Sequence, residues 1–283
     1  METKVSSVKK EITISAQRPT VLIGERINPT GKKNLAEALQ AGNLEIVRQE
    51  ALAQVKAGAD IIDVNVGAPS VDEVALLPQA VRVVMEAVDV PLCLDSTNPK
   101  ALEAALKVYK GKPIVNSVTG EERSLETILP LVKQYGAAVI GLTIDDEGIP
   151  KDAARRVSIA RKIVERVEAL GIPPQDVIID CLAMAVAVDS KAGPPVIEAI
   201  RRIAAELRVN QTLGASNISF HMPDRDLINS AFLAIVIAAG VTCPIVDVAK
   251  VRPIALAADL VLGRDDYARR YIKAYRERQK RQR

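Results

Sequence analysis

Five polar side chains of this 283-residue chain lie inside runs of sequence that are otherwise apolar. They are Asp63, Asp95, Asn116, Asp180 and Asn217. A buried carboxylate or amide is costly unless it is paired, so these residues need partners. Together they offer hydrogen-bond acceptors and donors that suit the rim of a flat heterocycle with N–H, NH₂ and carbonyl groups. If the fold brings them to one place, they form a polar small-molecule site in an apolar wall.

These residues belong to short runs that read as β-strands. The runs are residues 20–25, 60–66, 90–96, 113–117, 137–143, 176–182, 212–217 and 243–248. Nearly continuous apolar character is typical of strands buried on both faces, as in parallel sheets, and amphipathic helical stretches separate the runs. Eight strand–helix units in about 250 residues predict a (β/α)8 TIM barrel, an α/β fold. A doubly wound open sheet is the alternative, but the chain lacks the GxGxxG fingerprint that often accompanies it.

In a TIM barrel the active site lies at the carboxyl ends of the strands, and further polar residues fall at those expected ends. They are Glu25, Asn28, Asn65 and Ser219. Ser96, Ser117 and Asp145 also follow strands, but taken singly such residues are best explained as helix caps or loop hydrogen bonds. The only histidine, His221, is interpreted as a loop residue rather than a catalyst.

Composition narrows the function. The formal net charge is only +3, aromatic residues make up 2% and there is no Trp, so stacking platforms for single-stranded nucleic acid are scarce. No apolar stretch reaches membrane-spanning length and the first residues lack a signal-peptide core, so we expect neither a membrane protein nor a secreted one. The three scattered cysteines match no disulfide or zinc spacing, which favours the reducing cytoplasm. No metal-binding motif is present, and no metal is expected.

The chain shows no Ser/Gly-rich linker, so we expect a single domain over residues 1–283 with its core at about 20–262. Residues 264–283 form a basic helix or tail. Its simplest interpretation is a solvated helix face, and docking to a partner or an anionic surface is the alternative.

Several segments together resemble a known family. They are GERINPTG (24–31), DVNVGAP (63–69), LCLDSTN (92–98), VNSVTGEE (115–122), GLTIDDEGIPKD (141–152) and GASNISFHMPDRDLIN (214–229). The chain resembles, from about residue 21 to about residue 262, the pterin-binding barrels of corrinoid-dependent methyltetrahydrofolate methyltransferases. That family includes the enzyme that methylates a corrinoid/iron–sulfur protein in acetogens and the folate domain of cobalamin-dependent methionine synthase.

The resemblance implies roles for individual residues. Asp95, Asn116 and Asp180 match residues that hold the pterin ring, with Asp180 at its guanidine-like edge. Asn217 matches the amide that reaches the methyl-bearing nitrogen, and Asp95, Ser219 or Asp63 would hold the water that supplies a proton. The other matching positions in the pterin site are Arg225, Glu25, Asn28, Asp63 and Asn65. Phe220 stands where the acetogen enzyme usually has glutamine, and Cys181 stands where a proline often follows the aspartate.

The implied reaction is methyl transfer from methyltetrahydrofolate to the cob(I)amide of a separate corrinoid protein, of which a corrinoid/iron–sulfur protein is one candidate. The resemblance also implies a homodimer. A dihydropteroate synthase-like enzyme is the first alternative, although the usual GGESTRPG-like loop is replaced by NVGAPS and the basic Gly-rich segment by DCLAMAVAVD. The second alternative is a non-catalytic folate-binding subunit.

Overall fold

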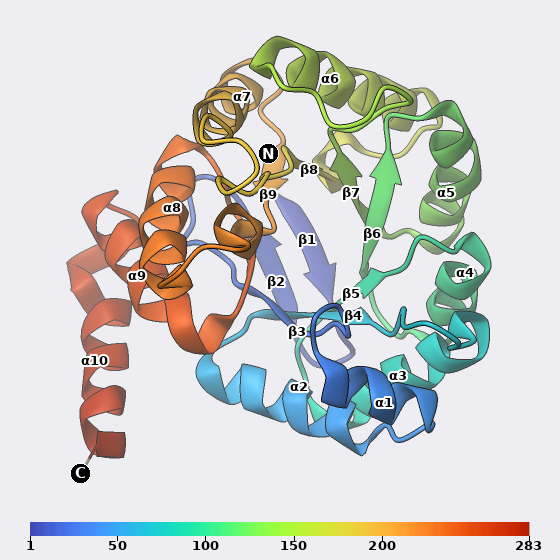
Figure 1. The fold of residues 1–283 in the computed structure, drawn as a ribbon, viewed down its shortest axis with the longest axis horizontal. Helices are drawn as coiled ribbons and strands as arrows, with labels where there is room; N and C mark the ends of the chain where they lie inside the picture. Colours follow the sequence, from blue (N-terminus) through green and yellow to red (C-terminus); the bar gives the residue numbers. More distant parts are fainter. Residues whose placement is uncertain (283) are drawn as a thin grey trace.

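The computed structural model describes residues 1–282 and contains a barrel of eight parallel strands inside a ring of helices (Figure 1). The strands are β3 (Ile23–Ile27), β4 (Ile61–Asn65), β5 (Leu92–Asp95), β6 (Ile114–Thr119), β7 (Ala138–Leu142), β8 (Val177–Asp180), β9 (Asn210–Thr212) and β10 (Ile245–Val246). They follow the order β10-β3-β4-β5-β6-β7-β8-β9. A parallel bridge between Gly214 and Ile245 joins the two edge strands, which closes the barrel. The predicted TIM barrel is therefore confirmed.

The helices surround these strands on the outside. They are α1 (Lys33–Gln40), α2 (Glu45–Ala57), α3 (Glu73–Ala87), α4 (Pro99–Val108), α5 (Glu122–Tyr135), α6 (Ala153–Ala169), α7 (Gly193–Glu206), α8 (Arg225–Ala239), α9 (Val248–Val261) and α10 (Arg269–Gln282). Asp72, Asn98 and Asp152 accept backbone N–H bonds at the starts of α3, α4 and α6, as good N-cap residues do. Gly58 and Gly136 end α2 and α5 in the left-handed conformation.

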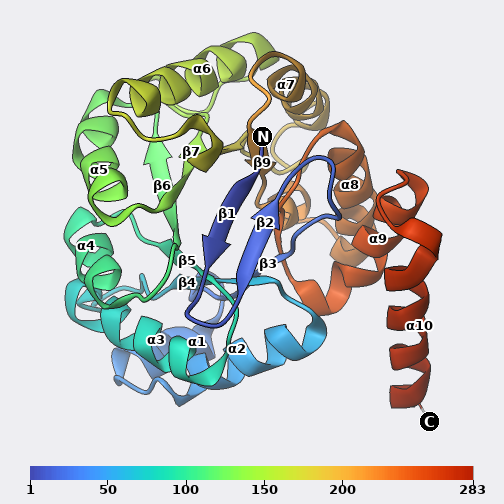
Figure 2. The same ribbon diagram turned by 180° about the vertical axis from the view of Figure 1, so that it is seen from behind.

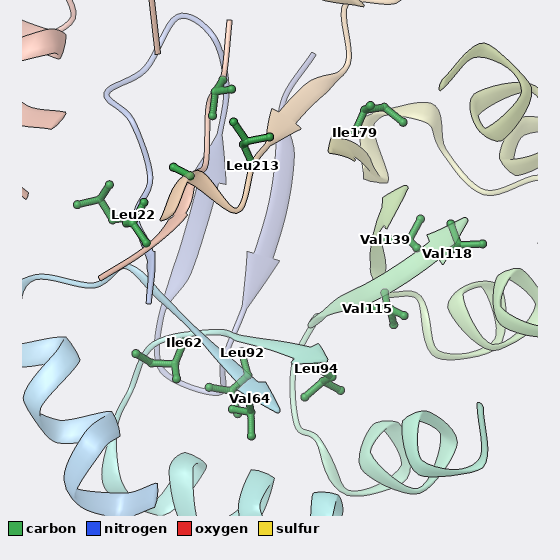
Figure 3. Close-up of a cluster of buried hydrophobic side chains, with 14 of the residues drawn as sticks. Leu22, Ile62, Val64, Leu92, Leu94, Val115, Val118, Val139, Ile179 and Leu213 are labelled. Atoms are coloured by element: carbon green, nitrogen blue, oxygen red, sulfur yellow. The ribbon is translucent and has the colours of Figure 1, made fainter. Parts of the chain in front are cut away.

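Alternate side chains of each barrel strand point to opposite faces, and both faces are buried. The outward set packs against the helices (Figure 3) and includes Leu22, Ile62, Val64, Leu92, Leu94, Val115, Val139 and Ile179. The inward set fills the barrel and includes Ile23, Ile61, Cys93, Ile114, Ala138 and Ile178. Burial on both faces explains why the strands read as nearly continuous apolar runs.

A β-hairpin covers the end of the barrel where the strands begin (Figure 2). It is formed by β1 (Thr3–Ser6) and β2 (Glu11–Ile14), which pair antiparallel. Val5 and Ile14 join the interior cluster of the barrel. Asn210, the first residue of β9, donates from Nδ2 to Thr3 Oγ1 at 2.8 Å and to the Ile14 carbonyl at 3.0 Å. The interior core thus draws on residues before 20, which the sequence did not reveal.

The seventh barrel strand differs from the prediction. It was expected over residues 212–217, but β9 ends at Thr212 and a 3-10 turn, η2 (Ala215–Ser219), follows. Two further 3-10 turns are η1 (Pro174–Asp176) and η3 (Asp266–Ala268). The expectation was wrong because Gly214, Ser216 and Asn217 favour turns, and the backbone N–H of Asn217 donates to the Gly214 carbonyl at 3.2 Å.

The basic segment after residue 264 includes helix α10, which lies outside α9 (Figure 1). The Asp265 carboxylate accepts from the backbone N–H groups of Arg270 and Tyr271 at 3.0 and 2.9 Å and so caps this helix. Ala274 is buried. Residue 283 of the predicted tail lies outside the described residues, and the single domain over 1–283 with its core at about 20–262 stays a prediction.

Candidate active site

Four of the predicted site residues form a hydrogen-bonded group on three consecutive strands. The register places Asn65 beside Asp95, and Asp95 beside Asn116. Asn65 Nδ2 donates to Asp95 Oδ2 at 2.9 Å, and Asn116 Nδ2 donates to Asp63 Oδ1 at 3.1 Å. Each carboxylate is thus paired with an amide from a different strand, which is the pairing that burial demands.

Burial controls the ionisation of the two aspartates in this group. Loss of solvent, with the negative charge of Asp95 as the second cause, raises the pKa of Asp63 well above its ordinary value. Burial also raises the pKa of Asp95 to about 6, against a hydrogen bond from Asn65 that lowers it. Because a further hydrogen bond from Asp63 lowers the pKa of Asp95, we infer a protonated Asp63 beside an ionised Asp95 at neutral pH.

Asp180 occupies the end of β8, beside Leu142 of β7 and Thr212 of β9. Its Oδ1 accepts the backbone N–H of Leu182 at 2.6 Å. Burial raises the pKa of Asp180 to about 6, and the backbone amides of Leu182 and Gly214 and the charge of Arg156 oppose that rise. Asp180 is therefore a buried carboxylate that is ionised at neutral pH.

The η2 turn that carries Asn217 is held from two sides. Ser216 Oγ lies 3.0 and 3.2 Å from the two carboxylate oxygens of Glu25 on β3 and donates to that carboxylate. Arg225, the first residue of α8, donates to the Ser216 carbonyl at 2.9 Å and to Ser219 Oγ at 3.0 Å. An anion and a cation thus fix the residues on either side of Asn217.

The side chain of Asn217 makes no hydrogen bond within residues 1–282, so its amide is available to a ligand. Gly214 leaves it room. A Cβ atom at position 214 would stand 3.0 Å from Asn217 Nδ2, which is closer than nine in ten real Cβ contacts. A side chain at position 214 would therefore push this amide away by a few tenths of an ångström.

Glu25 carries its own electrostatic environment. Burial is the largest cause that raises its pKa, and the nearby Asp247 adds to the rise. The hydrogen bond from Ser216 and the charges of Lys32 and Arg26 act in the opposite direction. Lys32 Nζ donates to the backbone carbonyls of Glu25 and Arg26 at 3.3 and 3.0 Å, which ties this cation to the strand end.

The remaining predicted residues are engaged in local contacts. Asn28 Oδ1 accepts the Thr30 N–H at 3.0 Å and shares no hydrogen bond with the other site residues. Ser219 is fully buried, and its Oγ donates to the Ser216 carbonyl at 3.3 Å while accepting from Arg225. The Arg225 guanidinium also lies 4.7 Å from the centre of the Phe220 ring. The structure therefore groups most predicted residues at the strand ends. Asn28 and Ser219 instead make hydrogen bonds within the turns that carry them.

The sequence profile described as "Pterin binding enzyme" matches residues 24–247, which is most of the chain and includes every predicted site residue. The chain belongs to the pterin-binding enzyme family. It is 32% identical over 267 residues to the methylcorrinoid:tetrahydrofolate methyltransferase of Eubacterium limosum, covering 91% of this chain and 96% of that protein. It is also 32% identical over 289 residues to the methionine synthase of Mycobacterium tuberculosis, covering 94% of this chain but only 24% of that protein. The resemblance seen in the motifs is therefore confirmed.

Solved structures of pterin-binding enzymes share the fold. A dihydropteroate synthase from Yersinia pestis matches with a TM-score of 0.71 and 15% identity over 92% of this chain and 99% of that one. One from Xanthomonas albilineans matches with a TM-score of 0.67 and 18% identity over 93% of this chain and 99% of that one. At such low identity the likeness concerns the barrel alone.

Sequence reasoning missed one buried charged residue beside this candidate site. Arg156 on α6 is buried and contacts the chain just after Asp180. A signal was available, because Arg156 stands on the same stripe of its helix as Ile159, Ala160 and Ile163. A charged residue on an apolar stripe needs an explanation.

Within residues 1–282 no group of Cys, His, Asp and Glu side chains is arranged to hold a metal ion. In the same part of the chain, no helix combines the length and the apolar character needed to cross a bilayer.

Proposed function

We propose that this protein is a methyltransferase that moves a methyl group between methyltetrahydrofolate and the cobalt of a corrinoid carried by a separate protein. The observation that carries the proposal is the match to the methylcorrinoid:tetrahydrofolate methyltransferase of Eubacterium limosum over nearly the whole of both chains. The polar residues at one end of this barrel supply the donors and acceptors that a pterin ring needs.

Pterin binding rests on three strand ends in this proposal. Asp180 accepts N–H bonds from the guanidine-like edge of the ring, because an ionised carboxylate is the strongest acceptor for such donors. Asp95 and Asn116 hold the rest of the ring, and their own partners Asn65 and Asp63 fix their orientation. The remaining proposed contacts at the edge of the site are Glu25, Asn28 and Arg225.

Methyl transfer to cob(I)amide breaks the bond between the methyl carbon and a tertiary amine nitrogen, which is a poor leaving group. The nitrogen leaves more readily when it is protonated or strongly hydrogen-bonded. The free amide of Asn217 makes a bond that strengthens as charge develops on this nitrogen, which stabilises the transition state. Water supplies the proton. Asp95 is better placed than Ser219 to hold this water, because Ser219 Oγ already contacts Ser216 and Arg225.

The partner and setting belong to the same proposal. The methyl acceptor is a separate corrinoid protein, with a corrinoid/iron–sulfur protein as the specific candidate. We also infer that two copies of the chain form a homodimer and that the enzyme works in the cytoplasm. The resemblance supports these points, and the scattered reduced cysteines support the last one.

The first test mixes the protein with free cob(I)alamin and methyltetrahydrofolate and follows the corrinoid spectrum. We expect loss of cob(I)alamin and formation of methylcobalamin at a rate proportional to the protein. Because the name of the Eubacterium limosum relative describes transfer toward tetrahydrofolate, methylcobalamin with tetrahydrofolate is assayed as well. No protein-dependent change in either direction would contradict the proposal.

The same sample separates the alternatives. A dihydropteroate synthase-like enzyme would join a pterin pyrophosphate to an aromatic amine without any corrinoid. A non-catalytic subunit would bind methyltetrahydrofolate in calorimetry and leave the corrinoid spectrum unchanged in both directions.

A further inference from the structure

Arg156 is an unusual residue for the interior of a barrel protein. Its side chain on α6 is only 2% exposed, and it lies between the helix and the end of β8. Arginine is almost never fully buried unless it is paired. Within residues 1–282 Arg156 forms no ion pair, and its Nε has no hydrogen-bond partner.

The guanidinium instead contacts the backbone just beyond the proposed pterin ligand. The Nη1 atom of Arg156 donates to the carbonyl of Cys181 and, at 2.7 Å, to the carbonyl of Leu182. Leu182 has a φ of +57°, a conformation that is uncommon for a side chain of this kind. These bonds hold two successive carbonyls that a turn of this shape brings together.

The same turn orients Asp180. The N–H of Leu182 donates to Asp180 Oδ1 at 2.6 Å. This N–H belongs to the same peptide group as the Cys181 carbonyl, which accepts a hydrogen bond from Arg156. Moving the 181–182 backbone therefore moves the carboxylate. Arg156 reaches Asp180 through this turn rather than by direct contact.

Stability alone does not account for this arginine. Burial of a cation with an unpaired N–H is costly, and an apolar side chain of similar volume often stabilises a protein more than a buried charge does. The neighbouring stripe of α6 is apolar, so methionine would fit its surroundings. The positive charge of Arg156 therefore needs a reason other than stability, and its contacts with the turn after Asp180 provide one.

We propose that Arg156 is a positioning residue that holds the 180–182 turn in its binding geometry and, through its positive charge, favours the carboxylate form of Asp180. The inference rests on the proposed function, in which Asp180 binds the guanidine-like edge of the pterin. Arg156 itself does not touch the pterin.

The groups that face Asp180 leave Arg156 as its compensating charge. They are Arg156 on α6, the Cys181 thiol beside it in sequence and the Cys243 thiol before β10. Burial raises the pKa of Cys181 and raises that of Cys243 to about 12, so both thiols are neutral at neutral pH. Asp152 at the start of α6 acts on Arg156 rather than on Asp180. Loss of Arg156 therefore raises the pH at which Asp180 ionises.

The test compares Arg156→Met with Arg156→Lys. Affinity for methyltetrahydrofolate is measured by calorimetry from about pH 5 to about pH 8, and thermal unfolding is followed beside it. Arg156→Met should unfold at the same or a higher temperature, bind about tenfold more weakly, and lose affinity at a higher pH than the wild type does. Arg156→Lys keeps the positive charge but lacks the planar guanidinium with its fixed donors. The pH at which half of the affinity is lost should therefore return toward the wild-type value, while the affinity itself stays reduced.

Asp180→Asn is the matched control, because it removes the carboxyl group through which Arg156 acts. Any pH dependence that remains in Asp180→Asn comes from other groups, and adding Arg156→Met to it should change the pH profile no further. If Arg156→Met does not fold, Arg156→Gln takes its place in the comparison with Arg156→Lys.

Three outcomes decide the inference. A neutral variant with the wild-type affinity and pH profile overturns it, and so does a loss of affinity that is equal at every pH in the neutral and lysine variants. If the wild-type protein binds no methyltetrahydrofolate, that result contradicts the proposed function itself rather than the role of Arg156.

Discussion

The two ends of the barrel interior use the same strands in opposite ways. Toward the hairpin the inward residues are apolar and almost fully buried; they include Ile61, Cys93, Ile114 and Ile178. Two residues further along the same strands stand Asp63, Asp95, Asn116 and Asp180. Two residues, about 7 Å of strand, therefore separate the two sets. The apolar set is called the floor of the barrel, and the polar set at the strand ends is called its mouth.

This contrast separates the residues that stabilise the fold from those proposed to act on the substrate. Each floor residue gains free energy by leaving water, whereas the aspartates at the mouth are held where burial disfavours their charge. The hairpin adds Val5 and Ile14 to the floor and nothing to the mouth. Substitutions at the two ends should therefore separate folding from catalysis.

The largest expected effect belongs to Asn217 at the mouth. Asn217→Ala should lower the rate of methyl transfer by about 100-fold to about 1000-fold, because the amide bond that strengthens in the transition state is lost. Affinity for methyltetrahydrofolate and the unfolding temperature should change little, since the Asn217 side chain forms no hydrogen bond within residues 1–282. Single-turnover kinetics and calorimetry measure the two quantities separately.

The control for this prediction is Asn43→Ala, which removes an exposed amide outside the site whose Oδ1 accepts the Glu45 N–H at 3.0 Å. It should leave the transfer rate near the wild-type value. If Asn217→Ala weakened pterin binding as much as it slowed transfer, the amide would act in the ground state and the mouth would be a binding surface only.

The floor should respond in the opposite way. Ile114→Ala removes a fully buried side chain from the interior cluster and should destabilise the protein by about 3 kcal/mol. The folded fraction of Ile114→Ala should bind methyltetrahydrofolate almost as well as the wild type, because Asn116 keeps its place two residues further along the strand. Urea unfolding measures the first quantity and calorimetry the second.

Ile114→Val is the graded control and should cost about 1 kcal/mol. If the affinity for methyltetrahydrofolate fell in step with stability across these two variants, packing of the floor would be coupled to binding at the mouth. The two regions would then not be independent.

An effect of similar size but opposite sign on stability is expected at Asp180. The pKa of Asp180 is about 6 in the folded protein, against about 3.9 for an unfolded aspartate. Below about pH 4 both states are protonated and the burial costs nothing, whereas between about pH 4 and about pH 6 the unfolded state loses its proton first and the protein loses stability. Asp180→Asn should therefore gain about 3 kcal/mol of stability at neutral pH, at about 1.36 kcal/mol for each pKa unit, and bind pterin more weakly.

Urea unfolding at about pH 4 and at about pH 7.5 checks this sign, because the gain should vanish at the lower pH. A variant less stable than the wild type at both values would show that the carboxylate contributes more to the 180–182 turn than its burial costs.

Much of the barrel could be predicted because the strands are apolar on both faces and polar only at their ends. The hairpin could not, since TKVS and EITI are short and carry few large apolar residues, and their burial depends on contact with the barrel interior. The seventh strand was placed too late in the sequence because the apolar residues before Gly214 were extended into a turn-forming segment.

The site was predictable as a set of residues but not as a set of contacts. Asp63, Asp95 and Asn116 were expected to converge, yet which amide pairs with which carboxylate depends on a register that only the folded barrel defines. Ser219 was expected to hold water, but its hydroxyl bonds within its own turn, because a 3-10 turn rather than a strand end carries it. Its catalytic role stays a prediction.

The smallest effect tests how firmly the mouth itself is built. Ser216→Ala removes the hydroxyl that donates to Glu25, while the bond from Arg225 to the Ser216 carbonyl remains. Because one of two clamps on the turn is lost, the transfer rate should fall by about fivefold, which is about 1 kcal/mol, with little change in pterin affinity. Ser230→Ala, at a half-buried serine of α8 whose hydroxyl donates to the Asp226 carbonyl, is the matched control and should leave both unchanged. A Ser216→Ala rate as low as that of Asn217→Ala would mean that Arg225 alone cannot hold the turn, and an unchanged rate would mean that Glu25 does not position it.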